Sequence, residues 1–308
     1  MRHCLSPSGQ GYRGRFAPSP SGPLHLGSLL TALASFLEAR SRSGEWLVRI
    51  DDIDSRRTRP GAADSILRSL EALGLHWDGD VLHQQQRLDR YREALERLQA
   101  RGLVYACACS RRALAESQAH GVYPGTCRNQ HYKAQPGRHA LRVRATATPI
   151  RFEDRVQGEI VQNLAGEVGD FVVYRRDGDY AYHLATVVDD ADQGITDVLR
   201  GQDLLDSTPR QIYLQQQLDL PTPTYAHTPI LIDMSGHKLS KRSLAPEAET
   251  RQPRRILAAL LAWLRHPLPI ALRGASVTDI LNWAVADWRL DQLRLAGPIT
   301  VDPESLNA

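Results

Sequence analysis

Apolar positions recur with two different periods over the first hundred residues, and these periods predict strands and helices in turn. Residues 13–17 form a short extended run, whereas residues 26–40 place leucine and phenylalanine about every 3.6 residues, as in a helix with one buried face. Residues 45–50, Glu-Trp-Leu-Val-Arg-Ile, predict a buried strand. Amphipathic helices are expected at 62–73 and 87–101. This order of elements is typical of one half of a Rossmann-like α/β sheet.

The pattern changes twice in the rest of the chain. Residues 140–175 alternate polar and apolar positions, which predicts hairpin strands, and we interpret them as part of an insertion between two halves of the sheet. A helix at 180–190, a strand from 195 to 200 and a strand at 229–233 return to the α/β pattern. Helices are then expected at 254–265, 277–285 and 288–295.

Composition and charge exclude few classes of protein. With 308 residues the chain can bury a sizeable core, and its net charge of +3 argues only weakly for a nucleic-acid partner. No apolar run reaches the roughly 18–20 residues of a membrane span, so no membrane association is expected. The first residues lack the apolar segment of a signal peptide, which predicts a cytoplasmic protein.

Lysine is rare, and its distribution points to one loop. Only three of the 38 lysine and arginine residues are lysines, and two of them, Lys238 and Lys241, flank Ser240. A compact ammonium group is not equivalent to a planar guanidinium at a phosphate site. The loop is therefore suited to hold a triphosphate, although an exposed basic hairpin is the plainer interpretation.

A proline-rich turn follows the first predicted strand. It delivers His25, Gly27 and Ser28 to the start of the helix at 26–40, beside the end of the strand. Free backbone N–H groups and the positive end of the helix dipole favour an anion such as phosphate at this place. The alternative is an ordinary βα loop with a surface histidine.

Charged side chains follow two predicted strands. Asp51 comes directly after the strand at 45–50, and Arg200 ends the strand that begins at 195. In parallel α/β sheets the carboxyl ends of strands border the crevice that holds small ligands. A guanidinium there can bind a carboxylate through two hydrogen bonds. Taken alone, the acidic residue could equally belong to a turn before the next helix.

Three of the four cysteines lie within 21 residues, at Cys107, Cys109 and Cys127. This spacing predicts a metal site rather than disulfides. Three thiolates leave a tetrahedral zinc one ligand short, and the candidates for the fourth are Tyr123, His120, His131 or water. Three cysteines without a metal are the alternative.

Two segments resemble signature motifs of the class I glutamyl-tRNA synthetases. Residues 15–27, Arg-Phe-Ala-Pro-Ser-Pro-Ser-Gly-Pro-Leu-His-Leu-Gly, resemble the HIGH region, and residues 238–242, Lys-Leu-Ser-Lys-Arg, resemble the KMSKS loop. The resemblance covers about residues 13–245. It implies an α/β fold, namely a class I aminoacyl-tRNA synthetase Rossmann-like catalytic domain with a zinc-bearing, β-containing insertion and a short helical C-terminal tail.

The resemblance also implies how the chain is divided. The expected segments are a flexible leader at 1–12, the first half of the catalytic domain at 13–105, a zinc-bearing insertion of the kind that meets tRNA at 106–175, the second half of the catalytic domain at 176–245 and a helical C-terminal segment at 246–308. Only 66 residues follow Arg242, so no anticodon-binding domain is expected.

Site residues follow from the matching positions of the family's motifs. The resemblance implies that His25 and Lys241 are catalytic. It implies that ATP, with Mg²⁺, is bound by His25, Gly27, Ser28, Lys238, Ser240 and Lys241. It implies that glutamate is bound by Arg15, Phe16, Ala17, Pro18, Ser19, Asp51, Tyr182 and Arg200. Where the family has glutamate, this chain has Asp51, which is one methylene shorter.

The short relatives of these synthetases give the most specific match. They bind one structural zinc through a Cys-x-Cys…Tyr-x-x-x-Cys pattern, which corresponds to Cys107, Cys109, Tyr123 and Cys127. This resemblance, to the glutamyl-queuosine tRNA(Asp) synthetases, implies activation of L-glutamate by ATP without tRNA. It then implies transfer of glutamate to queuosine in the anticodon of tRNA(Asp), by an enzyme expected to be a monomer.

Other functions fit some of the same motifs. A glutamyl-tRNA synthetase would charge the 3′ end of its tRNA, and a non-catalytic tRNA-binding paralogue would show no glutamate-dependent pyrophosphate exchange. A class I ligase for a different amino acid is a more distant alternative, for which Asp51 would be the clue.

Overall fold

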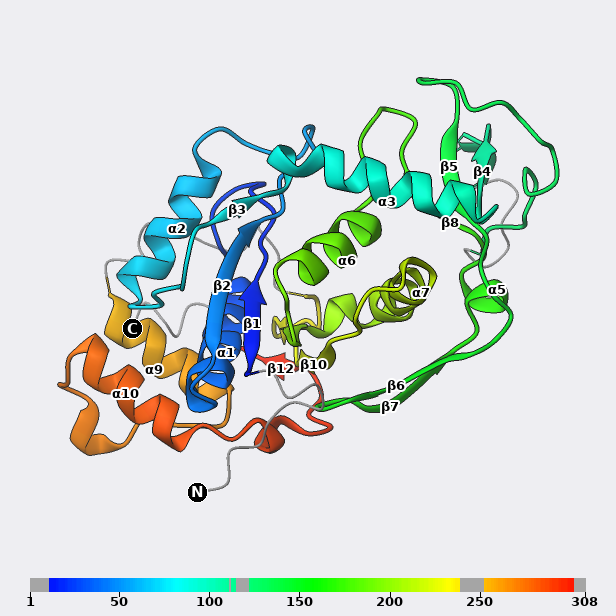
Figure 1. Ribbon diagram of the computed structural model, residues 1–308. Coiled ribbons are helices and arrows are strands. Elements are labelled where there is room, and N and C mark those ends of the chain that lie inside the picture. Colours follow the sequence, from blue (N-terminus) through cyan, green and yellow to red (C-terminus); the bar gives the residue numbers. More distant parts are fainter. Residues whose placement is uncertain (1–10, 111, 115–121, 239–251, 302–308) are drawn as a thin grey trace.

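The computed structural model describes residues 11–110, 112–114, 122–238 and 252–301. The first half of the α/β domain is a parallel sheet in the order β1–β2–β3 with two crossover helices (Figure 1). Its elements are β1 (Arg13–Phe16), α1 (Leu26–Ser41), β2 (Glu45–Ile50), α2 (Ala62–Ala72) and β3 (Leu82–His83). The four elements predicted between residues 13 and 73 are thus confirmed to within one residue at either end.

The second half is a four-stranded sheet in the order β7–β6–β10–β9. Its strands are β6 (Ile150–Asp154), β7 (Gly158–Gln162), β9 (Asp197–Gly201) and β10 (Thr224–Thr228), of which only the β6–β7 pair is antiparallel. One hydrophobic core joins helices that Figure 1 shows beside one another. These are α3 (Leu88–Ala100), which follows the 3₁₀ turn Gln84–Arg87, with α6 (Tyr182–Asp192) and α7 (Thr208–Leu218). Strand β10 was not predicted from the sequence.

The two sheets meet where β1 lies beside the start of β9. The Thr196 N–H donates to the Arg13 carbonyl at 3.0 Å, and the Arg13 N–H donates to Thr196 Oγ1 at 2.9 Å. From this junction the chain winds away in opposite directions, through α1 to β2 on one side and through α7 to β10 on the other. Such a reversal leaves a crevice at the carboxyl ends of the two strands, where open α/β sheets bind their ligands.

The segment predicted as an insertion contributes to two sheets. Strands β4 (Val104–Cys107), β5 (Ala140–Val143) and β8 (Phe171–Tyr174) form an antiparallel sheet of their own. The β6–β7 hairpin, with the short helix α5 (Leu164–Glu167) after it, instead extends the sheet of the second half. The boundaries at 106 and 175 stay a prediction, but part of this segment builds the same layer as the second half.

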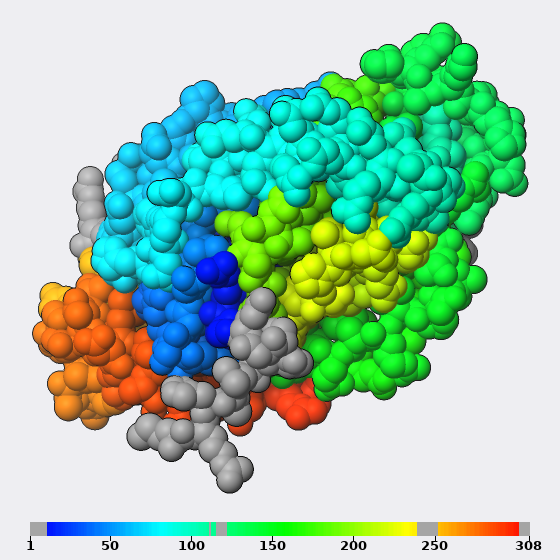
Figure 2. Space-filling view, in the orientation of Figure 1, coloured from blue at the N-terminus to red at the C-terminus, as the bar shows by residue number. Residues whose placement is uncertain are grey.

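The C-terminal helices belong to the core of the first half. Helices α9 (Pro253–Trp263) and α10 (Val277–Asp287) share a hydrophobic cluster with α1 and α2, and Figure 2 shows them in orange against the blue first half. Short strands β11 (Leu231–Ile232) and β12 (Ile299–Thr300) tie the tail to the chain after β10. No helix in the described ranges is long and apolar enough to cross a membrane.

The prediction of a third helix in the tail, at 288–295, is wrong. Only the 3₁₀ turn Leu290–Leu293 forms there. Trp288 has an extended backbone (φ −56°, ψ 129°), and its indole N–H donates to Glu38 Oε2 on α1 at 2.7 Å. The next residue's N–H donates to His266 Nε2 at 2.9 Å. These tertiary hydrogen bonds hold the start of the segment in an extended conformation against α1 and the chain after α9.

Candidate active site

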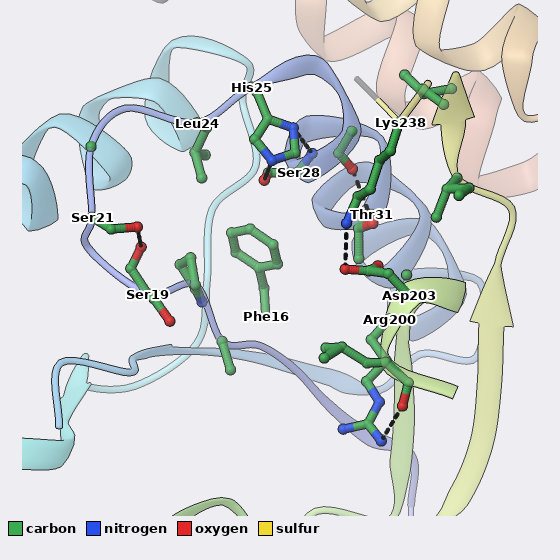
Figure 3. A pocket seen from close by; sticks show the side chains of 18 of the residues that line it. Phe16, Ser19, Ser21, Leu24, His25, Ser28, Thr31, Arg200, Asp203 and Lys238 are labelled. Atoms are coloured by element: carbon green, nitrogen blue, oxygen red, sulfur yellow. Dashed lines mark hydrogen bonds and ion pairs between the residues drawn. The ribbon is translucent and has the colours of Figure 1, made fainter. Parts of the chain in front are cut away.

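The carboxyl ends of β1 and β9 border a cavity of about 250 Å³, shown in Figure 3. Most of the residues predicted to bind ATP or glutamate line this one cavity. They are Arg15, Phe16, Ala17, Pro18, Ser19, His25, Gly27, Ser28, Tyr182, Arg200 and Lys238. Two segments far apart in the sequence, the turn after β1 and the turn after β9, therefore form opposite walls of a single site.

His25 caps helix α1 at one end of the cavity (Figure 3). Its extended backbone (φ −98°, ψ 167°) lets Nδ1 accept from the Ser28 N–H at 3.2 Å, and the Ser28 hydroxyl lies 3.1 Å from Nε2. A Cβ at Gly27 would lie 3.2 Å from the imidazole, so glycine gives the ring room to fold over the first turn. The histidine and the positive end of the helix together favour an anion here.

Lys238 approaches the same end of the cavity from the segment after β11. Its Nζ forms an ion pair with Asp203 Oδ2 at 2.6 Å, and both side chains are partly exposed. The predicted residues Ser240 and Lys241 lie outside the described residues. In Figure 3 the described lysine lies toward the His25 end of the cavity, held by Asp203 of the opposite wall.

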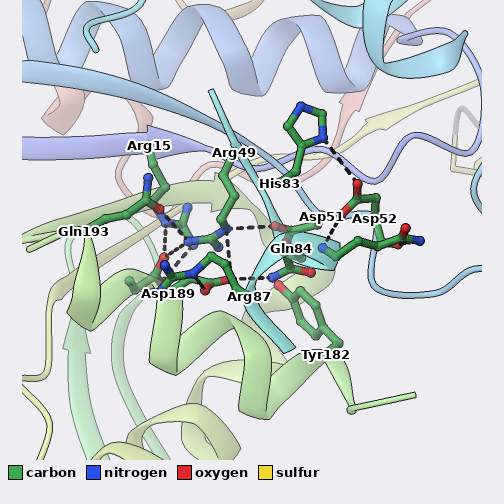
Figure 4. Close-up of polar contacts among 12 residues, drawn as sticks. Arg15, Arg49, Asp51, Asp52, His83, Gln84, Arg87, Tyr182, Asp189 and Gln193 are labelled. Carbon is green, nitrogen blue, oxygen red and sulfur yellow. Dashed lines mark hydrogen bonds and ion pairs between the residues drawn. The ribbon is translucent and has the colours of Figure 1, made fainter. Parts of the chain in front are cut away.

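Arg15 lines the cavity but is neutralised from behind by a buried ionic network (Figure 4). Its Nε and Nη2 donate to the two carboxylate oxygens of Asp190 at 3.1 and 3.3 Å. Arg49, fully buried, donates to Asp190 at 2.6 Å and to Asp51 at 2.8 Å, and lies 3.8 Å from Asp189. Burial alone would raise the pKa of Asp190, but the two guanidinium groups outweigh it and lower that pKa.

Asp51 belongs to this network and is not among the residues that line the cavity. It is 6% exposed, and its backbone N–H donates to the Pro18 carbonyl at 2.9 Å, which fixes it behind the proline-rich turn. Burial raises the pKa of Asp51 to about 6, against the opposing effect of Arg49. Asp51 thus lies behind the cavity, where its carboxyl group contacts Arg49.

Arg200 differs from Arg15 because no carboxylate within the described ranges pairs with it. The side chain is 4% exposed and lies in Figure 3 at the end of the cavity away from His25. Its guanidinium donates to His227 Nε2 at 3.0 Å, Thr208 Oγ1 at 2.8 Å and the Tyr182 hydroxyl at 3.4 Å, which are all neutral acceptors. A buried cation without a counter-ion at the wall of a cavity favours an anionic ligand.

Several of these side chains escaped the sequence analysis. Arg49 is a cation inside an apolar strand, and Asp189 and Asp190 end an apolar run in α6. Charges in segments that are otherwise buried are a usable signal, because such charges must pair with one another or bind a ligand. His227 and Asp154 gave no such signal, because the strand that carries the histidine was itself not predicted.

The cysteine cluster forms beside β4, as the spacing predicted. Cys107, Cys109 and Cys127 place their sulfur atoms within 4.8 Å of one another, a grouping that could hold a metal ion. The Tyr123 hydroxyl lies 3.5 Å from Cys107 Sγ and 4.0 Å from Cys109 Sγ. A tetrahedral zinc with Zn–S bonds of about 2.3 Å needs sulfurs about 3.8 Å apart, so this donor set fits. His131 is not part of the cluster, and His120 lies outside the described residues.

Arg142 supports the cluster from the neighbouring strand β5. Its Nε donates to Cys107 Sγ at 3.3 Å, and its guanidinium lies 3.9 Å from the centre of the Tyr123 ring. Burial would raise the pKa of Cys107, but hydrogen bonds with Tyr123 and Arg142 lower it. Burial and the neighbouring thiols raise the pKa of Cys109 to about 11. Arg142 thus already favours the thiolate form at Cys107.

Comparison with known proteins gives a consistent result. The model of the tRNA synthetases class I (E and Q), catalytic domain, matches residues 12–259. Glutamyl-Q tRNA(Asp) synthetase of Thiobacillus denitrificans is 54% identical over 91% of this chain and 94% of its own length. The protein of the same name from Chromobacterium violaceum is 52% identical over 94% of this chain and 97% of its own.

Solved structures of glutamate-tRNA ligases share the fold. The enzyme of Elizabethkingia meningosepticum in complex with its amino acid has a TM-score of 0.79 at 23% identity, and covers 96% of this chain and 68% of its own. The Elizabethkingia anophelis enzyme gives 0.80 at 22% identity, with 96% and 69% covered. The chain therefore belongs to the class I tRNA synthetases of the E and Q type, and within them to the glutamyl-Q tRNA(Asp) synthetase family.

Proposed function

We propose that this protein activates L-glutamate with ATP and transfers the glutamyl group to queuosine in tRNA(Asp). The relatives with more than 50% identity carry the name of this activity. The observation that carries the proposal is Arg200, a buried guanidinium without an acidic partner in the described structure, at the end of the cavity away from His25. An acidic amino acid can neutralise it while reaching a nucleotide at the other end.

The residues that line the cavity suggest how glutamate lies in it. The side-chain carboxylate would bind Arg200 and Tyr182, and the α-carboxylate would point toward His25. Arg15 and the backbone of the proline-rich turn would line the path between the two ends. Asp51, which is held by Arg49 and bonded through its backbone N–H to the Pro18 carbonyl, would attract the α-ammonium from behind the turn.

The first chemical step would form glutamyl-adenylate. An oxygen of the α-carboxylate attacks the α-phosphorus of ATP, and the bond to the leaving pyrophosphate breaks. His25 and the N–H groups at the start of α1 would stabilise the charge on the α-phosphate, and Lys238 and Lys241 that on the pyrophosphate. Bound Mg²⁺ would neutralise phosphate oxygens. A nucleophile of queuosine would then take the glutamyl group and release AMP.

Zinc is the metal that we propose for the cysteine cluster, with Cys107, Cys109, Tyr123 and Cys127 as ligands. Its role would be structural, because these four ligands would fill all positions of a tetrahedral zinc and leave none open to substrate. Cys109→Ser is expected to lower the zinc content per chain, measured by metal analysis of purified protein. An unchanged zinc content would rule this site out.

The decisive experiment measures glutamate transfer to tRNA(Asp) with and without its queuosine. We expect transfer only to the modified tRNA, and survival of the product after periodate oxidation of the 3′ end. Charging of tRNA(Glu) at a periodate-sensitive end would instead identify an ordinary glutamyl-tRNA synthetase. Lys241→Ala is expected to reduce glutamate-dependent ATP–pyrophosphate exchange by orders of magnitude, and near-normal exchange would contradict the role of that lysine.

A further inference from the structure

A buried pair of side chains lies directly behind Arg200. His227 on β10 is the register partner of Arg200 on β9, and its Nε2 lies 3.0 Å from Arg200 Nε. On the other side of the ring, Nδ1 lies 2.6 Å from Asp154 Oδ2 on β6. His227 is fully buried and Asp154 is 1% exposed. Three neighbouring strands thus contribute one side chain each to a continuous chain of hydrogen bonds.

Asp154 determines which nitrogen of the imidazole carries the proton. Its Oδ1 accepts from the backbone N–H groups of Val156, Gln157 and His227 at 3.0, 2.8 and 3.1 Å, which leaves Oδ2 for the ring. A carboxylate only accepts, so Nδ1 must donate to it. Nε2 then carries a lone pair and faces the Nε–H of Arg200, a group that can only donate.

The charge of the imidazole matters as much as its tautomer. Burial lowers the pKa of His227, and the nearby guanidinium groups of Arg200 and Arg15 add to this effect against the opposing Asp154. Tyr225, whose ring stacks on His227, and Thr208 are the other polar groups that face it. A neutral ring is therefore favoured, and it keeps the Asp154 carboxylate on the far side of the imidazole, out of direct contact with Arg200.

The remaining contacts of Arg200 fix its orientation. Nη2 donates to Thr208 Oγ1 at 2.8 Å and lies 3.4 Å from the Leu204 carbonyl, so the protein holds both Nε and Nη2. The third nitrogen, Nη1, donates to the Tyr182 hydroxyl at 3.4 Å. Arg200 and Tyr182 both line the cavity. Two rigid anchors on the guanidinium leave little freedom for its plane to rotate.

We propose that His227 and Asp154 are positioning residues, which together hold the guanidinium of Arg200 in the orientation that binds the carboxylate of glutamate. This inference rests on the proposed function and adds to it the residues that aim its main binding group. A carboxylate in the place of the imidazole would anchor Arg200 equally well but would cancel its charge. A neutral acceptor orients the cation and keeps it available for substrate.

Asp154→Asn tests the proposal with almost no change of shape. The amide would present an N–H to Nδ1, so the ring proton would move to Nε2 and oppose the Nε–H of Arg200. We expect the KM for glutamate in pyrophosphate exchange to rise about 10- to 100-fold, with less than about a twofold change in the KM for ATP. Asp197→Asn is the matched control, because this buried acid lies on the same strand as Arg200 and bonds to Thr196.

Histidine ¹⁵N NMR gives a readout that does not depend on activity. We expect an Nδ1–H tautomer for His227 in the wild type and an Nε2–H tautomer in Asp154→Asn, with the signal assigned from its loss in His227→Gln. His227→Gln can still offer an amide oxygen to Arg200 and is expected to bind glutamate better than His227→Leu. The wild-type tautomer and the comparison of the two His227 variants test the positioning role even if Asp154→Asn fails to fold.

Different results would overturn different claims. An Nε2–H tautomer in the wild type, an unchanged glutamate KM in folded Asp154→Asn, or equal glutamate KM values for His227→Gln and His227→Leu would each refute the positioning role. A wild-type protein without glutamate-dependent exchange would instead refute the proposed function, whatever the NMR shows.

Discussion

The two halves of the catalytic domain each bury an arginine at the wall of the same cavity, but they surround it differently. Arg15 is paired with Asp190 in a network that also contains Arg49, Asp51 and Asp189. Arg200 in the second half is held only by neutral acceptors. Burying an unpaired charge costs several kcal/mol, so such an arrangement is typical of a binding site and a balanced network is typical of structural support.

This contrast assigns different tasks to the two walls. The first wall is rigid and nearly neutral, since its charges bind one another. The second wall keeps one guanidinium that no carboxylate contacts directly and that a ligand can pair with. The difference also predicts different consequences of mutation, chiefly for stability on one side and for substrate binding on the other.

The largest effect is expected from Arg49→Met. It would leave the carboxylates of Asp51, Asp189 and Asp190 close together without their central cation, at a cost of about 3–5 kcal/mol in the free energy of unfolding. Urea unfolding followed by circular dichroism measures the loss. The matched control is Arg13→Met, whose ion pair with Glu45 is largely exposed and should contribute under about 1 kcal/mol. Equal losses in the two variants would show that the buried network is not structural.

Arg200→Lys is expected to affect binding rather than stability. The lysine keeps the charge but loses the fork that can bind a carboxylate through two hydrogen bonds, so the KM for glutamate should rise about 30- to 100-fold. Steady-state pyrophosphate exchange measures this, with Arg151→Lys on the exposed face of β6 as control. A glutamate KM within about threefold of the wild type would place the substrate carboxylate elsewhere.

The pH dependence of stability should reveal the acid at the back of the first wall. The pKa of Asp51 in the folded protein, about 6, lies above its ordinary value of 3.8, so the folded state holds the extra proton between these values. The contribution of the Asp51 carboxyl to the stability of the folded state is therefore present below about pH 4 and lost as pH rises through about 6. Asp51→Asn cannot ionise.

The free energy of unfolding of Asp51→Asn, measured relative to the wild type, should therefore increase by roughly 2–3 kcal/mol between pH 4 and pH 7. Urea titrations at a series of pH values would show this. A relative stability that stays flat or falls over that range would mean that the Asp51 carboxyl is as easily ionised in the folded state as in the unfolded one.

The smallest effect is expected at the exposed pair Lys238–Asp203. Both side chains are more than a third exposed, so Asp203→Asn should change stability by less than about 1 kcal/mol. Freeing the ammonium group should lower the KM for ATP by no more than about threefold. A rise of tenfold or more would indicate that Asp203 itself takes part in nucleotide binding.

Several regular elements and the turn that carries His25 were predictable because their signals are local. Helix α1 and strand β2 follow directly from the spacing of apolar residues, and the turn with His25 and Gly27 carries its proline and glycine pattern in a few residues. Strand β10 was missed because Thr224–Thr228 is short, mixed in polarity and buried in the middle of a sheet. Its signal is the pairing with β9 and β6, which no local pattern contains.

The sequence by itself determined the first four elements, the cysteine spacing, and the family through two motifs more than two hundred residues apart. Only the tertiary structure decided that Arg15 would be neutralised while Arg200 would keep its charge, and that His227 and Asp154 would lie behind Arg200. The reason is physical: a local pattern records which side chains are buried, but charge balance depends on what other strands bring within hydrogen-bond distance.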